Sequence, residues 1–274
     1  VKDHNVNHAM IKIGSGMNEK RAGRKDSKFD TNFRNAGYAS IHRGVYYYSY
    51  AKTTSDAKKE ARHCLKLLKE QGIDPTDLDL PVAFDIEEEA VFQTGRRNVT
   101  AVTTTFCDEI KKAGFEPMVY SGASALRNYF EYSKIREYKI WVAHYTKASA
   151  PAIPFSYDMW QYTSKGTVNG VSDRCDCNYA YKDYPAIMKK KCLNLYPSNA
   201  KNLDTTGYKK GDKGDGVLAL KYLLMLAKKK GMHNINLDKN DIFGAGTQKA
   251  VNNILKNHSY SQNGIAGKKF IELL

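Results

Sequence analysis

The chain has 274 residues, of which 42% are hydrophobic and 26% charged, a composition typical of globular proteins that excludes a disordered or fibrous chain. At roughly 150 residues per domain, its length suggests about two domains. No apolar run approaches the ~20 residues needed to span a bilayer, so we expect no membrane insertion. The polar start, Val1–Asn5, is unlike a secretory signal, and we expect production in the cytoplasm without a signal peptide.

The formal net charge of +14 is unevenly distributed. Residues 189–274 contain 16 Lys and 6 acidic residues, a net charge of +10, which leaves +4 for residues 1–188. A strongly basic module attracts polyanions such as nucleic acid, anionic lipid or an acidic cell wall, and charge alone does not choose among them.

The cysteines are an odd and sparse set for a chain of this length: Cys64, Cys107, Cys175, Cys177 and Cys192. A disulfide scaffold requires a denser, even number, so we predict reduced thiols. Cys175 and Cys177 have no His or Cys nearby at ligand spacing, which argues against a metal site. We predict neither metal nor cofactor.

Residues 1–188 alternate between short β-branched or aromatic runs and longer amphipathic stretches. We predict seven strands, at His8–Ile13, Gly44–Tyr50, Leu80–Ile86, Glu116–Ser121, Lys139–Tyr145, Ser156–Tyr162 and Arg174–Asn178. We predict helices between the first five strands, at Asp26–Ala39, Ser55–Gln71, Thr100–Ala113 and Ala123–Tyr132. This alternation favours a parallel sheet, and no Gly-x-Gly-x-x-Gly follows any strand. The predicted fold class is therefore α/β, an irregular (β/α) barrel.

The basic end of the chain has a different pattern. Residues 189–207 are polar and contain Pro197, which predicts a linker. Helical stretches follow at Val217–Ala227, Ala245–Asn257 and Lys268–Leu274. We predict a small all-α domain of three helices over residues 208–274.

The segment Leu80–Glu87 contains the strongest chemical signal. Side chains alternate along a strand, so Ala83, Asp85 and Glu87 should face the barrel axis, with both acids at the carboxyl end where barrel active sites lie. Placing two carboxylates together is costly, and folding alone gives no reason for it. Their side chains can converge to the ~5 Å typical of retaining glycoside hydrolysis, and their proximity raises one pKa. The alternative is a solvated acidic loop in which Asp85 caps the next element.

Two further sets of residues fit a glycan cleft. Asp176 shares a strand face with Asn178, and it joins the acids if Cys175 and Cys177 pack under helices; otherwise it is an ordinary turn residue. Aromatic rings at strand ends can stack on sugars, whereas any single ring can equally be core. The candidate sugar-contacting residues are Tyr46, Tyr48, Tyr120, Trp141, Tyr145, Trp160 and Gln161.

Over residues 6–185 these segments resemble the glycoside hydrolase family 25 lysozymes, or N-acetylmuramidases. The matching stretches are Ala9–Gly14, Phe29 with Asn32, Gly44–Ala51, Phe84–Glu87, Val119–Ser121, Trp141–Tyr145, Trp160–Tyr162 and Asp176–Asn178. The resemblance implies an irregular barrel that cleaves peptidoglycan after N-acetylmuramic acid with retention. It implies Glu87 as the general acid/base, Asp85 assisting the substrate acetamido group and Asp176 as a third acid.

The C-terminal part resembles the peptidoglycan-binding domain 1 type of module. The resemblance rests on Ile242–Gly244 with Thr247, Ala250 and Val251, and on Asn263–Gly267, where Asn263 replaces the usual aspartate. It implies anchoring to peptidoglycan, and the basic charge would suit anionic wall polymers. Together the two resemblances imply a cell-wall hydrolase that acts at the bacterial wall after release.

One departure from the family is substantial. Its first strand carries an Asp-x-Ser-type motif some twenty residues before the strand that corresponds to Ala9–Ile13, and only Val1–Asn7 stands there. We expect the first strand to be missing, either by truncation or naturally. If it is naturally missing, a gap in the barrel wall would expose backbone groups of the neighbouring strands. We expect reduced rather than abolished activity, because Glu87 and Asp85 remain.

Two other functions remain open from the sequence. The barrel could bind wall glycan without cleaving it. A nucleic-acid binder is disfavoured, because residues 189–274 contain no Arg and few aromatic residues.

Overall fold

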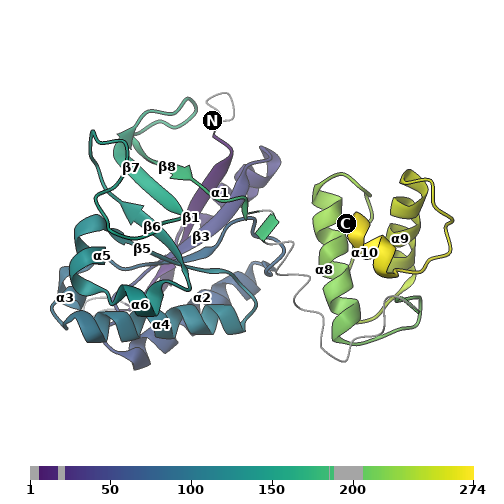
Figure 1. The fold of residues 1–274 in the computed structure, drawn as a ribbon, viewed down its shortest axis with the longest axis horizontal. Helices are drawn as coiled ribbons and strands as arrows, with labels where there is room; N and C mark the ends of the chain where they lie inside the picture. Colours follow the sequence, from purple (N-terminus) through teal and green to yellow (C-terminus); the bar gives the residue numbers. More distant parts are fainter. Residues whose placement is uncertain (1–5, 18–21, 185, 188–205) are drawn as a thin grey trace. The chain divides into compact units, whose positions relative to one another are not determined.

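The computed structural model describes residues 6–17, 22–184, 186–187 and 206–274. The chain divides into two compact units, Val1–Tyr184 and Pro185–Leu274 (Figure 1). Most of the linker predicted at residues 189–207 lies outside the described residues, as does Cys192. In the described part of the chain, no helix combines the length and apolarity needed to cross a bilayer.

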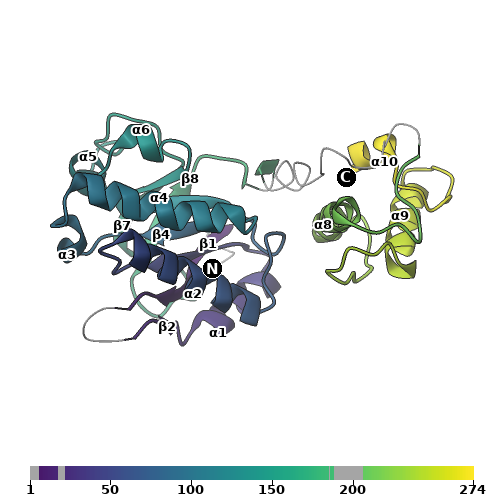
Figure 2. The ribbon, with the colours of Figure 1, turned by 90° about the horizontal axis from the view of Figure 1, so that it is seen from below.

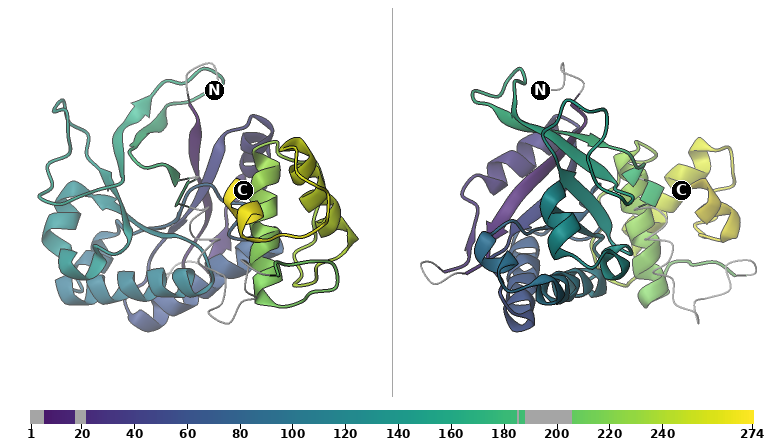
Figure 3. Two further views of the ribbon diagram at one scale, coloured as in Figure 1. Left: turned by 45° about the vertical axis from the view of Figure 1, so that its right-hand side comes forward. Right: turned by 60° about the vertical axis from the view of Figure 1, so that its left-hand side comes forward.

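The first unit is built on one curved sheet of eight strands, a half-barrel in the order β2-β1-β3-β4-β5-β6-β7-β8 (Figures 1 and 3). The strands are β1 (His8–Ser15), β2 (Arg24–Lys25), β3 (His42–Tyr48), β4 (Val82–Asp85), β5 (Pro117–Gly122), β6 (Lys139–Ala143), β7 (Met159–Gly166) and β8 (Cys175–Ala180). The pairs from β1–β3 to β6–β7 are parallel, whereas β2 and β8 lie antiparallel to their neighbours at the two edges. The predicted α/β class is confirmed. The prediction of seven strands is wrong, because it missed β2, which has only two residues.

Helices of the first unit cover the convex face of the sheet. They are α1 (Phe29–Tyr38), α2 (Thr54–Glu70), α3 (Glu89–Phe92), α4 (Arg96–Lys112), α5 (Ala123–Tyr129) and α6 (Tyr132–Ile135). The long helices α2 and α4 run side by side beneath the sheet (Figure 2). The helix predicted at Ser55–Gln71 is α2, which begins at Thr54 after Thr53, whose hydroxyl accepts the Asp56 N–H. It ends at Glu70, and Gly72, two residues later, adopts φ +65°.

The core of this unit lies between the sheet and its helices. Alternate residues of β3 and β4 supply it, and Val82, Phe84 and Ile86 are each at most 1% exposed. Phe84 stacks on Phe106 of α4 with ring centroids 4.1 Å apart. Because side chains alternate along a strand, this packing turns Ala83 and Asp85 to the opposite, concave face.

The second unit has its own core and contains α8 (Asp215–Lys229), α9 (Ala245–Asn257) and α10 (Lys268–Leu273). Each helix follows directly on a glycine, Gly214, Gly244 or Gly267. The interior also holds Lys221, which is 1% exposed and donates from Nζ to Asn240 Oδ1 at 2.8 Å and to Asp238. The three-helix prediction therefore agrees with the described elements of residues 206–274.

Candidate active site

The carboxyl end of β4 places two acidic side chains in one pocket of about 880 Å³. Asp85 and Glu87 both line it, and the chain between them is fixed, because Ile86 N–H donates to the Tyr120 carbonyl and Ile86 C=O accepts from the Ser121 hydroxyl. The main chain of Asp85 is held as well, since its carbonyl accepts the Ser49 N–H at 2.8 Å. The two carboxyl groups therefore project from a rigid segment on the concave face.

Burial differs between the two acids. Asp85 is 4% exposed, and its Oδ1 has no hydrogen-bond partner among the described residues. Burial, and then the neighbouring Glu87, raise the pKa of Asp85 well above its ordinary value. Glu87 is open to the pocket, and its pKa is raised by partial burial and then by Glu88. Two like charges in one pocket disfavour double ionisation, so the pair retains a proton more readily than separate carboxyl groups would.

Lys12 of β1 is the cation of this pocket that sequence reasoning missed. It lines the pocket opposite Tyr46 in the strand register, and its Nζ lies 4.7 Å from the Tyr48 ring centroid. Its charge lowers the pKa of both Asp85 and Glu87, against the effect of burial. The sequence did contain a signal for Lys12. It is a charged residue within an otherwise apolar strand, and it alternates with the same side of the strand as His8 and Met10, which line the pocket.

Aromatic rings from neighbouring strands form the wall beside the acids. The strand register places Tyr48, Asp85, Tyr120 and Trp141 in one row across β3, β4, β5 and β6. Trp141 contacts Tyr120 at 4.4 Å between centroids and meets the Tyr46 ring edge-on at 6.4 Å. The pocket is therefore lined by four of the predicted aromatic residues, Tyr46, Tyr48, Tyr120 and Trp141.

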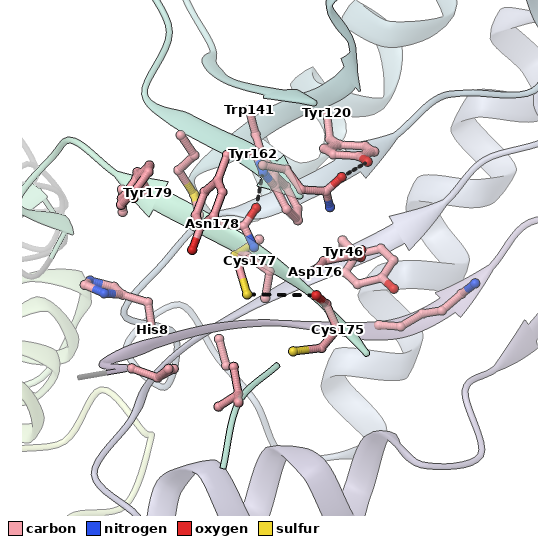
Figure 4. Close-up of a pocket in the computed structure, with 18 of the residues that line it drawn as sticks. His8, Tyr46, Tyr120, Trp141, Tyr162, Cys175, Asp176, Cys177, Asn178 and Tyr179 are labelled. Carbon is pink, nitrogen blue, oxygen red and sulfur yellow. Dashed lines mark hydrogen bonds between the residues drawn. The ribbon is translucent and has the colours of Figure 1, made fainter. Parts of the chain in front are cut away.

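Polar groups hold this wall in place. Gln161 of β7 lines the pocket, and its Oε1 accepts the hydroxyls of Tyr120 at 3.0 Å and Tyr145 at 2.5 Å. Trp141 Nε1 donates to Asn178 Oδ1 at 2.9 Å (Figure 4). Tyr145 is 55% exposed and touches the site through Gln161.

The last strand supplies the wall opposite β4. Asp176 of β8 is exposed and lines the same pocket as Asp85 and Glu87, and burial raises its pKa (Figure 4). The condition set for this placement, that Cys175 and Cys177 pack under helices, is not met. Because β8 is the edge strand of a hairpin, both are half-buried and line the pocket instead.

Trp160, another predicted site residue outside the pocket lining, lies in the core. It is 5% exposed within the core, and its Nε1 donates to the His144 carbonyl at 2.9 Å. Its neighbours Met159 and Gln161 line the pocket, so alternation along β7 turns Trp160 to the other face. Its predicted contact with sugar is therefore wrong.

The pocket combines acids, one cation, hydroxyls and flat apolar rings, a set suited to a neutral, hydroxyl-rich ligand and to proton transfer. Within the described ranges, no group of three or more His, Cys, Asp or Glu side chains is arranged to hold a metal ion.

Comparison with known families matches residues 1–171 to "Glycosyl hydrolases family 25". The lysozyme of Lactococcus phage mv1 is 32% identical over 125 residues, which cover 44% of this chain and 61% of that protein. The autolytic lysozyme of Clostridium acetobutylicum is 27% identical over 176 residues, covering 64% and 49%. The chain spans about half the length of most curated relatives it matches, including the uncharacterized Escherichia coli protein YegX, of which it covers 53%.

Solved structures agree with the fold of the first unit. The modular autolysin LytC of Streptococcus pneumoniae is 26% identical with a TM-score of 0.56, covering 65% of this chain and 41% of that one. The spore cortex lytic enzyme SleM of Clostridium perfringens has a TM-score of 0.57 at 22% identity, covering 65% and 61%, and supports the fold alone. Since the family match spans residues 1–171, which include β1 to β7, Asp85 and Glu87, this chain belongs to family 25 of the glycosyl hydrolases.

Proposed function

We propose that the chain is a cell-wall lysozyme that hydrolyses the β-1,4 bond between N-acetylmuramic acid and N-acetylglucosamine in peptidoglycan, with retention of configuration. The observation that carries this proposal is the pair Asp85 and Glu87, two carboxyl groups on one rigid segment of an aromatic-lined pocket. Membership of family 25 and the lysozymes among its relatives support the same activity.

In this proposal Glu87 is the general acid and then the general base. Glu87 protonates the glycosidic oxygen as the carbonyl oxygen of the substrate's own acetamido group attacks the anomeric carbon. The leaving sugar departs with that proton, and an oxazolinium ion forms. The ionised Glu87 then takes a proton from water, which attacks the same carbon and reopens the ring, so that two inversions give retention.

Asp85 stabilises the oxazolinium ion by accepting a hydrogen bond from the acetamido N–H. In the empty pocket, burial favours the uncharged form of Asp85. The positive charge that develops on the substrate favours the ionised form, so the interaction is stronger in the transition state than with the bound substrate. Lys12 aids this change, because its charge lowers the pKa of Asp85.

The remaining pocket residues bind and orient the glycan. Tyr46, Tyr48 and Tyr120 offer ring faces and hydroxyls to the sugars, with Trp141 behind them. Asp176 supplies a third acid on the opposite wall, where it reaches sugar hydroxyls.

For the second unit we propose a wall-anchoring role. The family match ends at residue 171, so this role rests on the resemblance of Ile242–Gly244 and Asn263–Gly267 to peptidoglycan-binding modules and on the lysine-rich composition. The lysines would add attraction to anionic wall polymers. Retention of the full chain on purified walls before and after chemical removal of those polymers tests this part. Equal retention would reject the anionic partner.

The enzymatic proposal is tested by the chemistry of the products. Purified peptidoglycan is digested, reduced with borohydride and hydrolysed, and the reduced amino sugar is identified. The proposal requires reduced muramic acid to appear. Reduced glucosamine would indicate cleavage of the other bond, and binding to walls with no new reducing ends would support the alternative of a non-hydrolytic glycan-binding protein acting at the cell wall.

A further inference from the structure

A buried carboxyl group on the convex side of the sheet, that of Glu60, takes no part in the chemistry above. Glu60 belongs to α2 and is 5% exposed. Its Oε2 accepts the Ser49 hydroxyl at 2.7 Å, and its Oε1 accepts the Tyr50 N–H at 2.9 Å. Both partners follow directly on Tyr48, the last residue of β3. The carboxyl group therefore binds the chain where β3 leaves the sheet.

The same carboxyl group is packed against the end of β1. Gly16 follows β1, and a Cβ atom there would lie only 1.7 Å from Glu60 Oε1, so the carboxyl fills the space that a side chain would need. Gly16 N–H in turn donates to the Tyr48 carbonyl at 2.8 Å. Glu60 thus contacts the ends of both β1 and β3.

These strand ends are bonded directly to the proposed site. Ser49 N–H donates to the carbonyl of Asp85 at 2.8 Å. The Tyr48 hydroxyl donates to Glu88 Oε1 at 2.7 Å, and the Tyr48 ring contacts that of Tyr50 at 5.1 Å. A change at Glu60 therefore reaches the wall of the pocket through one or two hydrogen bonds.

The surroundings of Glu60 favour its uncharged form. Among the described residues, the titratable groups that interact with Glu60 are Asp56 and Cys64 on α2 and Tyr47 on β3, whose hydroxyl lies 2.7 Å from His63 Nδ1. Burial raises the pKa of Glu60 to about 8, the Ser49 hydrogen bond opposes this, and Asp56 adds to it. Above that pH, ionisation places a negative charge in a dry site, and opening the turn to water relieves the cost.

We infer that Glu60 is a positioning residue, which in its protonated form holds the ends of β1 and β3 in place and, when ionised, releases the pocket wall that carries Tyr48. The predicted effect on glycan binding rests on the proposed function, whereas the predicted structural change at the ends of β1 and β3 does not.

The test uses Glu87→Gln as the background, so that the titration of Glu87 does not contribute. Glu60→Gln is added to it, because glutamine keeps an acceptor for the Tyr50 N–H and cannot ionise. Glu70→Gln, at the exposed end of the same helix, is the matched control. Hydrogen exchange at the Tyr50 and Gly16 amides is measured from pH 6 to 9, corrected for intrinsic exchange, together with the affinity for a soluble tetrasaccharide of alternating N-acetylglucosamine and N-acetylmuramic acid.

In the Glu87→Gln protein and in the Glu70→Gln control, both amides should lose protection above pH 8. If only the protonated form binds, affinity should fall about tenfold by pH 9, where about nine-tenths of Glu60 is ionised. The Glu60→Gln protein should keep its protection and its affinity to within about twofold. Protection with the same pH dependence in all three proteins would overturn the inference. Protection that changes as expected without tetrasaccharide binding at any pH would contradict the proposed function instead.

Discussion

Replacing Asp85 by Asn should stabilise the first unit at neutral pH while removing most of its hydrolytic activity. Asp85 is 4% exposed and its pKa is raised well above 3.8, mainly by burial. Between pH 3.8 and the raised value, the native state keeps a proton that the unfolded chain has released. The native state therefore binds more protons than the unfolded state in this window, and the free energy of unfolding falls as the pH rises.

Asparagine has a similar shape and no proton to lose, so the variant escapes this decline. The gain in stability should be near zero at pH 3 and should grow as the pH rises above 3.8, by about 1.4 kcal/mol for each pH unit until the raised pKa is reached. For a unit of this size, each gain of about 1.4 kcal/mol raises the midpoint of thermal unfolding by roughly 3–6 °C. Hydrolysis should fall by roughly 10²-fold or more, because the oxazolinium ion loses its counter-charge.

The assay is thermal unfolding of the full chain, followed by circular dichroism from pH 3 to 8. Asp173→Asn, at an exposed position in the loop before β8, is the matched control and should change nothing. An Asp85→Asn protein that is less stable than the wild type, or whose gain does not depend on pH, would refute the reasoning that Asp85 is held uncharged.

Four other substitutions separate the effects of charge, binding and packing. Lys12→Met should raise the pKa of Glu87 further, so the alkaline limb of the pH–rate profile should move to higher pH; a limb that stays in place would contradict this. Trp160→Phe should lower the free energy of unfolding by about 1–2 kcal/mol with KM unchanged, whereas Trp141→Phe should lower kcat/KM roughly tenfold, and the reverse pattern would place the wrong ring in the pocket. Lys221→Met should destabilise the second unit by about 1–3 kcal/mol in thermal unfolding, because the charge-assisted hydrogen bonds from the buried Lys221 Nζ to Asn240 and to the Ile242 carbonyl are lost, while hydrolysis of a soluble glycan stays unchanged.

Much of the fold could be predicted from sequence, because strand and helix periodicities differ and the first unit alternates regularly between them. The elements that were missed are short. Strand β2 has two residues and α3 has four, too few for either period to show. The predicted helix at Ser55–Gln71 is displaced by one residue from α2, because Thr53, Thr54 and Ser55 all suit the start of a helix, and the hydrogen bond from the Asp56 N–H to the Thr53 hydroxyl fixes the start.

Within the candidate site, strand parity separates the correct expectations from the wrong one. Parity placed Asp85 and Glu87 together on the concave face, where both line the pocket. The same rule turns Trp160 away from the pocket, because its neighbour Gln161 faces the pocket. Trp160 was nevertheless included in the predicted site, because the aromatic residues were grouped by their position at strand ends and not by the direction of their side chains. The edge position of β8, where residues of both parities such as Asp176 and Cys177 line the pocket, depends on the assembled sheet and has no local signal.

Lys12 and Glu60 carried readable signals of a different kind. Lys12 interrupts an apolar strand. Glu60 lies three residues after Ala57 and four before Cys64, on the buried stripe of an amphipathic helix. A charged residue on an apolar stripe indicates either a buried partner or a function, and the partner here, the Ser49–Tyr50 turn, is supplied by a different element.

The most direct measurement is the release of reducing ends from purified peptidoglycan by the wild type, Glu87→Gln and Glu89→Gln, at equal concentration and matched wall binding. Glu89 begins α3, two residues further on, and lies outside the pocket lining, so its substitution should leave the rate within about twofold. Glu87→Gln should reduce the rate by roughly 10²–10⁴-fold, as expected for loss of a general acid. A Glu87→Gln protein that cleaves walls at the rate of the wild type would contradict the assignment of catalysis to this pocket.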